Sequence, residues 1–278
     1  MKLGKIITRT TKPEEIDFKE KFNLEGKVIV ITGGCGLIGR AFVEAAAQFG
    51  ANVIIADLST TKPVVAAKRL EIRFKRKMLG MPVNISKRKS VETLLQTVLS
   101  DFGKIDGLVN CHQFKPFKFF ARFEDYTDSD WDVIIEINLK GTFLSCQIMG
   151  GWMAEHAGGC IINMPSIYSV VAPNQNLYKG TGSGCPVAYS ASKGGVESLS
   201  KYLASYWAHK GVRVNMITPH GVWDNHEDKF ESNFARFLPM ERMSYNHEVA
   251  SALIYLLSDA SSFVTGHNLI VDGGWTTW

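Results

Sequence analysis

The stretch that decides the fold is KVIVITGGCGLIG, residues 27–39, in which a β-branched run leads directly into a cluster of glycines. A continuous apolar run predicts a strand buried on both faces, and a helical pattern follows it from residue 38. Glycines permit a tight turn and let the backbone approach a pyrophosphate, which the free N–H groups of a helix N-terminus bind. Asp57 ends the next apolar run eighteen residues beyond Gly39, where a dinucleotide-binding unit places an acid. This context favours a nucleotide site over a plain structural turn.

The rest of the chain repeats this alternation of strand and helix. Further apolar runs that predict buried strands lie at residues 52–58, 78–85, 105–110, 160–166, 212–219 and 268–273, and helical patterns lie at 38–49, 89–102, 128–155, 189–209 and 246–258. Such alternation with right-handed crossovers predicts an α/β fold: a Rossmann-type, doubly wound, seven-stranded parallel sheet with helices on both faces. Because no repeat or long linker divides the chain, we predict a single domain over residues 25–278 and an N-terminal extension over residues 1–24.

Composition narrows the classes of protein that the chain can belong to. Of 278 residues, 45% are hydrophobic and 21% are charged, as in ordinary globular proteins. No apolar run reaches the roughly 18 residues of a membrane-spanning helix, so we expect no membrane partner. The five cysteines form no CxxC pair and the N-terminus has no secretory pattern, which favours the cytoplasm. The seven histidines show no metal-ligand spacing, so we expect no metal site.

The net charge of +4 comes from one local strip. Residues 62–90 hold ten Lys or Arg and a single acid, Glu71, so the rest of the chain is net negative. A basic strip can bind nucleic acid, or it can hold the extra phosphate of NADP. Because most of it follows Asp57 by several residues and falls on a helical pattern, we favour a solvated face that steers an anionic cofactor, with no nucleic acid as partner.

The strongest chemical signal is Tyr189-Ser190-Ala191-Ser192-Lys193. Positions four apart share one face of a helix, so the ammonium of Lys193 is expected near the phenol of Tyr189. A nearby cation lowers a tyrosine pKa from its usual ~10, as acid–base work near neutral pH requires. A strand ending at Ser166 and a helix carrying Asn138 accompany this motif.

Seven motifs occur in the order typical of one family: TGGCGLIG, LVN at 108–110, NL at Asn138, Ser166, YSASK, RVNMITP and LIVDGG. From about residue 25 to its end the chain therefore resembles the short-chain dehydrogenase/reductases. The resemblance implies that Tyr189 is the general acid/base, that Ser166 holds the substrate oxygen, and that Asn138 anchors a water in a proton relay. It implies that Lys193 binds the nicotinamide ribose and lowers the tyrosine pKa. The expected activity is interconversion of a secondary alcohol and a ketone on a small polar substrate, by a homotetramer or homodimer.

The interval between Ser166 and Tyr189 is longer than in most members of the family. In this it looks like a branch linked to surface-polysaccharide or flagellin-glycan sugar synthesis, which makes a sugar-derived substrate an expectation.

The resemblance also implies a cofactor site. The residues expected to contact the cofactor are Gly33, Cys35, Gly36, Leu37, Ile38, Gly39, Asp57, Leu58, Asn84, Ile85, Asn110, Cys111, Tyr189, Lys193, Pro219 and Val222. Asp57 favours NAD, because a carboxylate there accepts from the ribose hydroxyls and repels the 2′-phosphate of NADP. An NADP-preferring carbonyl reductase that uses Lys62 or the basic strip is the alternative.

Two loops depart from the family pattern. The segment Asn110-Cys111-His112-Gln113 stands in place of NNAG, and Pro219-His220-Gly221 stands in place of PG. Both histidines follow strand ends, where ligands bind in such sheets. Either histidine could bind substrate or titrate near neutrality, and His112 and His220 are therefore candidate substrate contacts together with Tyr168 and Trp223. Ordinary polar roles in the loops are the alternative.

Two further segments allow two interpretations each. Aromatic residues after the fourth predicted strand could stack on nucleic acid or form a wall of the substrate site: Phe114, Phe117, Phe119, Phe120 and Phe123. Residues 222–245, with Phe230, Phe234 and Phe237, predict a mobile lid or a fixed surface helix. A non-catalytic, nucleotide-sensing protein on the same fold remains the alternative to an enzyme.

Overall fold

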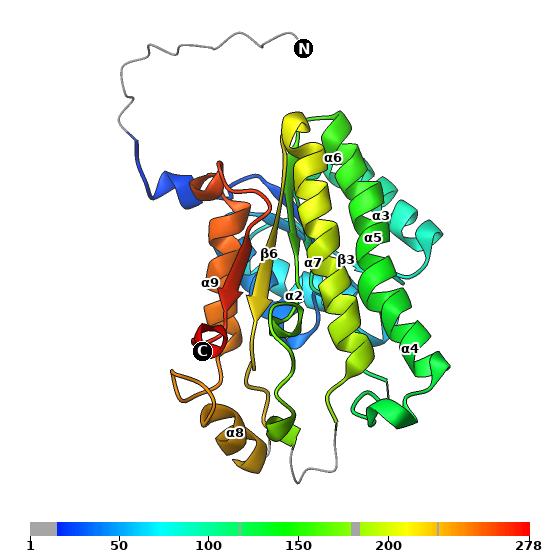
Figure 1. Ribbon diagram of the computed structural model, residues 1–278. Helices are drawn as coiled ribbons and strands as arrows, with labels where there is room; N and C mark the ends of the chain where they lie inside the picture. The colour runs from blue at the N-terminus through cyan, green and yellow to red at the C-terminus, as the bar shows by residue number, and fades with distance from the viewer. Residues whose placement is uncertain (1–15, 117, 179–183, 227) are drawn as a thin grey trace, which may run out of the picture.

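The computed structural model describes residues 16–116, 118–178, 184–226 and 228–278 (Figure 1). Residues 1–15 of the predicted extension, and Phe117 of the aromatic stretch, lie outside the described residues. Within residues 16–24, Leu24 is fully buried and packs into the core, and the ring of Phe22 lies 6.5 Å from that of Tyr255. This part of the extension therefore packs on the body of the protein.

A seven-stranded sheet, parallel throughout, forms the centre of the molecule in the order β3-β2-β1-β4-β5-β6-β7. The strands are β1 (Val28–Thr32), β2 (Asn52–Asp57), β3 (Met78–Pro82), β4 (Gly107–Asn110), β5 (Gly159–Asn163), β6 (Val212–Pro219) and β7 (Asn268–Val271). The predicted doubly wound sheet is confirmed. The strand order reverses between β1 and β4, and ligands bind at such a switch point beyond the carboxyl ends of the strands.

Helices cover both faces of this sheet, and Figure 1 shows β6 between α9 on one side and α7 on the other. The first layer holds α1 (Leu37–Gln48), α2 (Pro63–Phe74) and α9 (Asn246–Leu257), which bury Phe42, Leu70 and Leu253 against the sheet. The second holds α3 (Arg88–Phe102) and α7 (Val187–Trp207), which bury Leu94 and Trp207. Two apolar cores therefore sandwich the sheet and fix its carboxyl edge.

The predicted helix at 128–155 is interrupted by two π-helical segments. It consists of α4 (Asp128–Ile134), a π-helical segment (Ile135–Lys140), α5 (Gly141–Ser145), a second π-helical segment (Cys146–Gly150) and α6 (Gly151–Glu155). Thr127 caps its start by accepting from the N–H of Asp130 at 3.2 Å. Single-turn π segments are rare and often mark functional positions, and Asn138 lies in the first of them.

Candidate active site

A cavity of about 980 Å³ lies at the carboxyl edge of the sheet and brings together most of the predicted site residues. Those that line it are Gly33, Cys35, Gly36, Leu37, Ile38, Gly39, Asp57, Leu58, Asn84, Ile85, Cys111, His112, Ser166, Tyr168, Tyr189, Lys193, Pro219, His220 and Val222. Asn110, Asn138 and Trp223 are not among the lining residues. One continuous hollow therefore joins the glycine turn to the Tyr-Lys helix.

The glycine turn forms one end of this cavity. Gly33 has a φ of +67°, and a Cβ added at Gly39 would lie 2.1 Å from the carbonyl oxygen of Gly33. Gly36, the N-cap of α1, brings no side chain over the first turn of the helix. Asp57 accepts from the N–H of Cys35 at 2.9 Å and of Leu58 at 2.7 Å, so its carboxylate fixes the turn and faces the cavity. A bare backbone cradle with an acid beside it fits a dinucleotide.

Replacing Gly39 with Ala is expected to weaken NADH binding roughly tenfold or more, because the new methyl group must push the turn out of shape. Fluorescence titration with NADH measures the change. Gly151→Ala is the matched control, since a Cβ there meets nothing within 4 Å and a helical Gly→Ala change is mildly stabilising. Equal NADH affinity in both variants would contradict the assigned cradle.

The Tyr-Lys pair lies at the other end of the cavity, on the first two turns of α7. The Nζ atom of Lys193 is buried, donates to the carbonyl oxygen of Met164 at 2.6 Å and lies 5.5 Å from the centre of the Tyr189 ring. The rings of Phe119 and Tyr168 meet Tyr189 edge-on, with centroids 5.6 and 6.3 Å away. The phenol is therefore held between aromatic edges on a fixed helix.

Burial controls the acid–base properties of the pair. It raises the pKa of Tyr189 to about 12, and a hydrogen bond with Ser166 opposes the rise. Burial also lowers the pKa of Lys193 to about 8. The ammonium of Lys193 is directed at the carbonyl oxygen of Met164, and the loss of water around the phenol has the largest effect on the pKa of Tyr189. The predicted lowering of that pKa by Lys193 stays a prediction. Ser166 is the neighbour that favours the phenolate.

Asn138 lies beside the cavity and is fully engaged. Its Oδ1 accepts from the N–H of Phe114 at 3.0 Å, and its Nδ2 donates to Ser192 at 3.3 Å. Its carbonyl oxygen accepts from Thr142 at 2.7 Å. The side chain thus ties the loop after β4 to α7. The water relay predicted for it stays a prediction.

Asn110 is not among the residues that line the cavity, and its predicted contact with the cofactor stays a prediction. It is buried behind the sheet edge, donates to Asn163 at 2.8 Å and accepts from Ser145 at 2.7 Å. These bonds join β4 to β5 and α5. Cys111, next to it, does line the cavity, and burial raises the pKa of its thiol to about 12, which favours a packing role over a reactive one.

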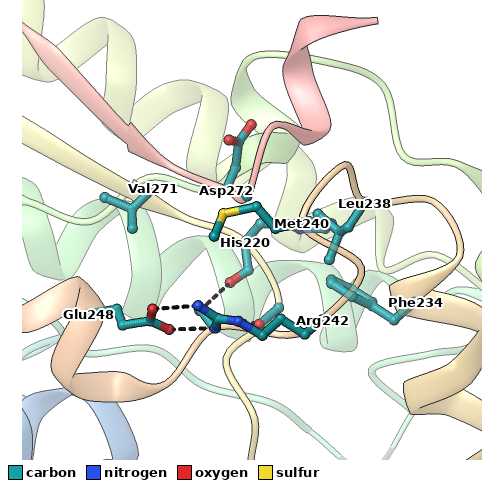
Figure 2. Close-up of a pocket in the computed structure, with 11 residues that line it drawn as sticks. His220, Phe234, Leu238, Met240, Arg242, Glu248, Val271 and Asp272 are labelled. Atoms are coloured by element: carbon teal, nitrogen blue, oxygen red, sulfur yellow. Dashed lines mark hydrogen bonds and ion pairs between the residues drawn. The ribbon is translucent and has the colours of Figure 1, made fainter.

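The two predicted histidines line the cavity in different ways. His112 is held at both ring nitrogens, with Nδ1 2.7 Å from Oγ1 of Thr32 and Nε2 3.4 Å from Oγ1 of Thr142. The Nε2 atom of His220 is buried with no hydrogen-bond partner among the described residues (Figure 2). Burial lowers the pKa of each to about 3, so titration near neutrality is wrong for both. Both imidazoles are neutral at working pH.

The predicted lid segment packs over the substrate end. Its helix α8 (Asp228–Ala235) places the ring of Phe234 4.3 Å from His220 and 6.0 Å from Trp275, and Phe234 is buried. These contacts favour the fixed-helix interpretation. Trp223 is not among the residues that line the cavity, and its ring lies 6.5 Å from that of Tyr245. Its predicted substrate contact stays a prediction.

Several cavity residues were not predicted from the sequence. The hydroxyl of Tyr178 lies 3.0 Å from that of Tyr168, and the Lys87–Glu136 ion pair, at 3.1 Å, borders the nucleotide half. Phe114, Phe119 and Phe120 of the aromatic stretch line the cavity, which favours a substrate wall over stacking on nucleic acid. No spacing or motif distinguishes Tyr178 or the ion pair in the sequence, since their partners come from other elements.

The described residues hold neither a cluster of metal ligands nor a membrane-spanning helix. No group of three or more His, Cys, Asp or Glu side chains is arranged to hold a metal ion in that part of the chain. None of the helices found there has the length and apolar character needed to cross a membrane.

Comparisons with known proteins identify the family of the chain. The profile of the family described as "Enoyl-(Acyl carrier protein) reductase" matches residues 36–276. The chain is 35% identical over 274 residues to "D-threitol dehydrogenase" of Mycolicibacterium smegmatis, covering 96% of this chain and 99% of that one. It is 34% identical over 264 residues to "NAD-dependent glycerol dehydrogenase" of Listeria innocua, covering 93% and 97%. A crystal structure of a gluconate 5-dehydrogenase from Burkholderia cenocepacia, in complex with NADP and tartrate, aligns with a TM-score of 0.84 at 26% identity, covering 93% and 98%.

Fold, site and matches define an oxidoreductase that acts on CH–OH groups with NAD(P). The chain belongs to the short-chain dehydrogenase/reductase family, as its seven motifs predicted.

Proposed function

We propose that the protein is an NAD-dependent dehydrogenase that interconverts a secondary alcohol and a ketone on a small polyol or a related sugar derivative. One observation carries the proposal: Ser166, Tyr189 and Lys193 meet in the same cavity as the glycine turn and Asp57. Two relatives are named for threitol and glycerol, which supports a small polyol as substrate. The likeness to the flagellin-glycan branch stays a prediction.

In this proposal each end of the cavity would hold a different part of the cofactor. The turn at residues 33–39 and Asp57 would hold the pyrophosphate and the adenosine ribose, and Lys193 would hold the nicotinamide ribose. When bound, the nicotinamide ring accepts a hydride from the alcohol carbon or returns it to a ketone. The protein supplies alignment and proton transfer.

Tyr189 moves the proton in this scheme. In oxidation its phenolate takes the hydroxyl proton of the alcohol, and the C–H electron pair leaves with the hydrogen as the C=O bond forms. In reduction the phenol returns the proton to the new alkoxide. Ser166 hydrogen-bonds the reacting oxygen and favours the phenolate. Asn138 acts as a positioning residue that holds α7 against the loop after β4.

Asp57 supports NAD over NADP. Its carboxylate lines the cavity, whereas Lys62 is not among the lining residues. Lys87, which also belongs to the basic strip, does line the cavity but is paired with Glu136. Replacing Asp57 with Asn is expected to raise the ratio of kcat/KM with NADP to that with NAD about 10- to 100-fold, because a repulsion of a few kcal/mol with the 2′-phosphate is removed. Initial rates with both cofactors measure it, with the exposed Asp101→Asn as control. An unchanged ratio would show that Asp57 does not cause a preference for NAD.

A panel of small polyols and hydroxyketones, followed by NADH absorbance, tests the activity itself. Turnover of a polyol with NAD supports the proposal. Tight NADH binding without turnover of any member would favour the nucleotide-sensing alternative instead.

Two further proposals concern the setting of the enzyme. The five cysteines are all free thiols, which supports a reducing compartment such as the cytoplasm. Self-association as a homotetramer or homodimer, and a single domain over residues 25–278, are kept as proposals that size-exclusion chromatography and limited proteolysis test.

A further inference from the structure

His220 is an unusual feature of the substrate end. It follows Pro219 at the carboxyl end of β6, and its ring packs against those of Phe234 and Trp275, with centroids 4.3 and 4.5 Å away. The residue is only 7% exposed, and its Nε2 atom has no hydrogen-bond partner in the part of the chain that the structure describes. A polar ring is therefore packed against an aromatic cluster with its Nε2 atom unsatisfied.

Neighbouring charges do not satisfy this ring. The negative charge of Asp272 raises the pKa of His220 against the effect of burial. That carboxylate is already engaged, because it accepts from the N–H of Gly274 at 2.9 Å and from the N–H and hydroxyl of Thr276 at 2.8 and 2.7 Å. Arg242 is paired with Glu248 through two bonds, at 2.8 and 2.7 Å. Buried polar atoms without partners are rare and costly in proteins, so a role in binding a ligand explains this one.

His220 lies where two hollows meet. It lines the large cavity, and it also lines a second cavity of about 70 Å³ under α8. Figure 2 shows His220 there beside Asp272, Met240 and Phe234, with the Arg242–Glu248 pair below them. The volume exceeds the ~30 Å³ share of one water and suits a group such as a hydroxymethyl. The hollow thus adds a small, partly polar compartment beside His220, and Tyr189 is not among the residues that line it.

We propose that His220 binds a second hydroxyl group of the substrate, remote from the carbon that reacts, and that the small cavity receives the end of the chain that carries it. The inference rests on the proposed function and narrows its substrate to polyols and hydroxyketones with at least two oxygens. A neutral imidazole carries one donor nitrogen and one acceptor nitrogen, and a hydroxyl group can donate to or accept from whichever nitrogen it meets.

The test compares alcohols of equal length in variants that keep or remove the ring nitrogens. The probes are threitol, which has four hydroxyls, and 2-butanol, which has one. His220→Phe keeps an aromatic ring but has no nitrogen, His220→Gln restores a donor and an acceptor, and His209→Leu changes an exposed histidine as control. The readouts are kcat/KM with saturating NAD and the affinity of threitol for the enzyme–NADH complex, followed by NADH fluorescence.

We expect His220→Phe to lower kcat/KM for threitol about 10- to 100-fold, to weaken threitol binding by a similar factor, and to change 2-butanol less than about threefold. His220→Gln should recover part of the loss. NADH affinity serves as the check on folding, and if His220→Phe fails it, the smaller His220→Leu carries the same comparison. Unchanged threitol constants, or an equal loss on both alcohols, would overturn the inference while the activity itself stands. If the wild-type enzyme oxidises neither alcohol and binds no threitol, the proposed function is ruled out, and this inference is ruled out with it.

Discussion

Replacing Tyr189 with Phe is expected to lower kcat for alcohol oxidation about 10²- to 10⁴-fold while NADH affinity changes less than about twofold. The reason is local. The hydroxyl of Tyr189 lies in the cavity with Ser166, and removing it leaves the alcohol proton without a base. The ring itself, packed between Phe119 and Tyr168, remains in place, so the helix and the cofactor end keep their shape.

Steady-state kinetics and NADH titration measure the two effects separately. The control is Tyr202→Phe, which removes a hydroxyl from an exposed tyrosine on the same helix. Because burial raises the pKa of Tyr189 to about 12, the fraction of phenolate grows with pH, and oxidation by the wild type should rise with pH across the alkaline range. The residual rate of Tyr189→Phe should lack this rise. Retained activity in the variant would rule out Tyr189 as the base.

The local parts of this site could be predicted from the sequence because they depend on neighbours along the chain. The apolar run 27–33 and the glycines after it define a strand, a turn and a helix start within a few residues, and the structure has them there. The four-residue spacing of Tyr189 and Lys193 placed both in one cavity. What spacing did not predict was the direction of the ammonium, since its acceptor, Met164, lies on another element.

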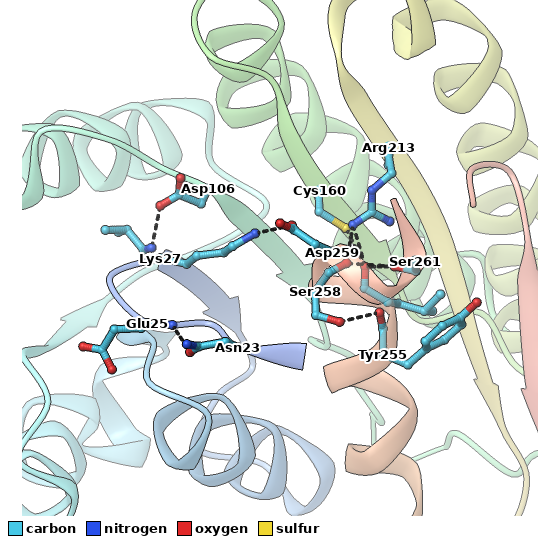
Figure 3. Close-up of polar contacts among 12 residues, drawn as sticks. Asn23, Glu25, Lys27, Asp106, Cys160, Arg213, Tyr255, Ser258, Asp259 and Ser261 are labelled. Carbon is cyan, nitrogen blue, oxygen red and sulfur yellow. Dashed lines mark hydrogen bonds and ion pairs between the residues drawn. The ribbon is translucent and has the colours of Figure 1, made fainter. Parts of the chain in front are cut away.

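Contacts between segments that are distant in sequence could not be predicted either, because the two partners lie on different elements. At the end of the sheet opposite the cavity, Lys27 pairs with Asp259 at 2.8 Å across 232 positions of sequence, and Asp106 accepts from the N–H of Val28 (Figure 3). No pattern in the chain marks these partners. The π-helical segment around Asn138 was missed because a single wider turn barely disturbs a helical pattern of apolar residues.

Replacing Lys193 with Met is expected to lower kcat/KM roughly 10- to 100-fold and to weaken NADH binding as well. Methionine fills a similar volume, so the main loss is the ammonium. That group is 4% exposed and donates to the carbonyl oxygen of Met164, which then lies buried without its donor. A hydrogen bond from a charged group is stronger than a neutral one, and under the proposed function the nicotinamide ribose loses it too.

The pH dependence of NADH binding distinguishes this role from a purely structural one. Burial lowers the pKa of Lys193 to about 8, so its ammonium is charged at pH 7 and is lost as the pH rises through that value. Wild-type NADH affinity should therefore fall between about pH 7 and 9, and the fall should be absent in Lys193→Met. Lys201→Met, two turns along α7, removes an exposed ammonium that pairs with the largely buried Glu197, and it should keep the wild-type profile. A Lys193→Met variant that retains both the affinity and its pH dependence would show that the ammonium holds the Met164 backbone and does not bind cofactor.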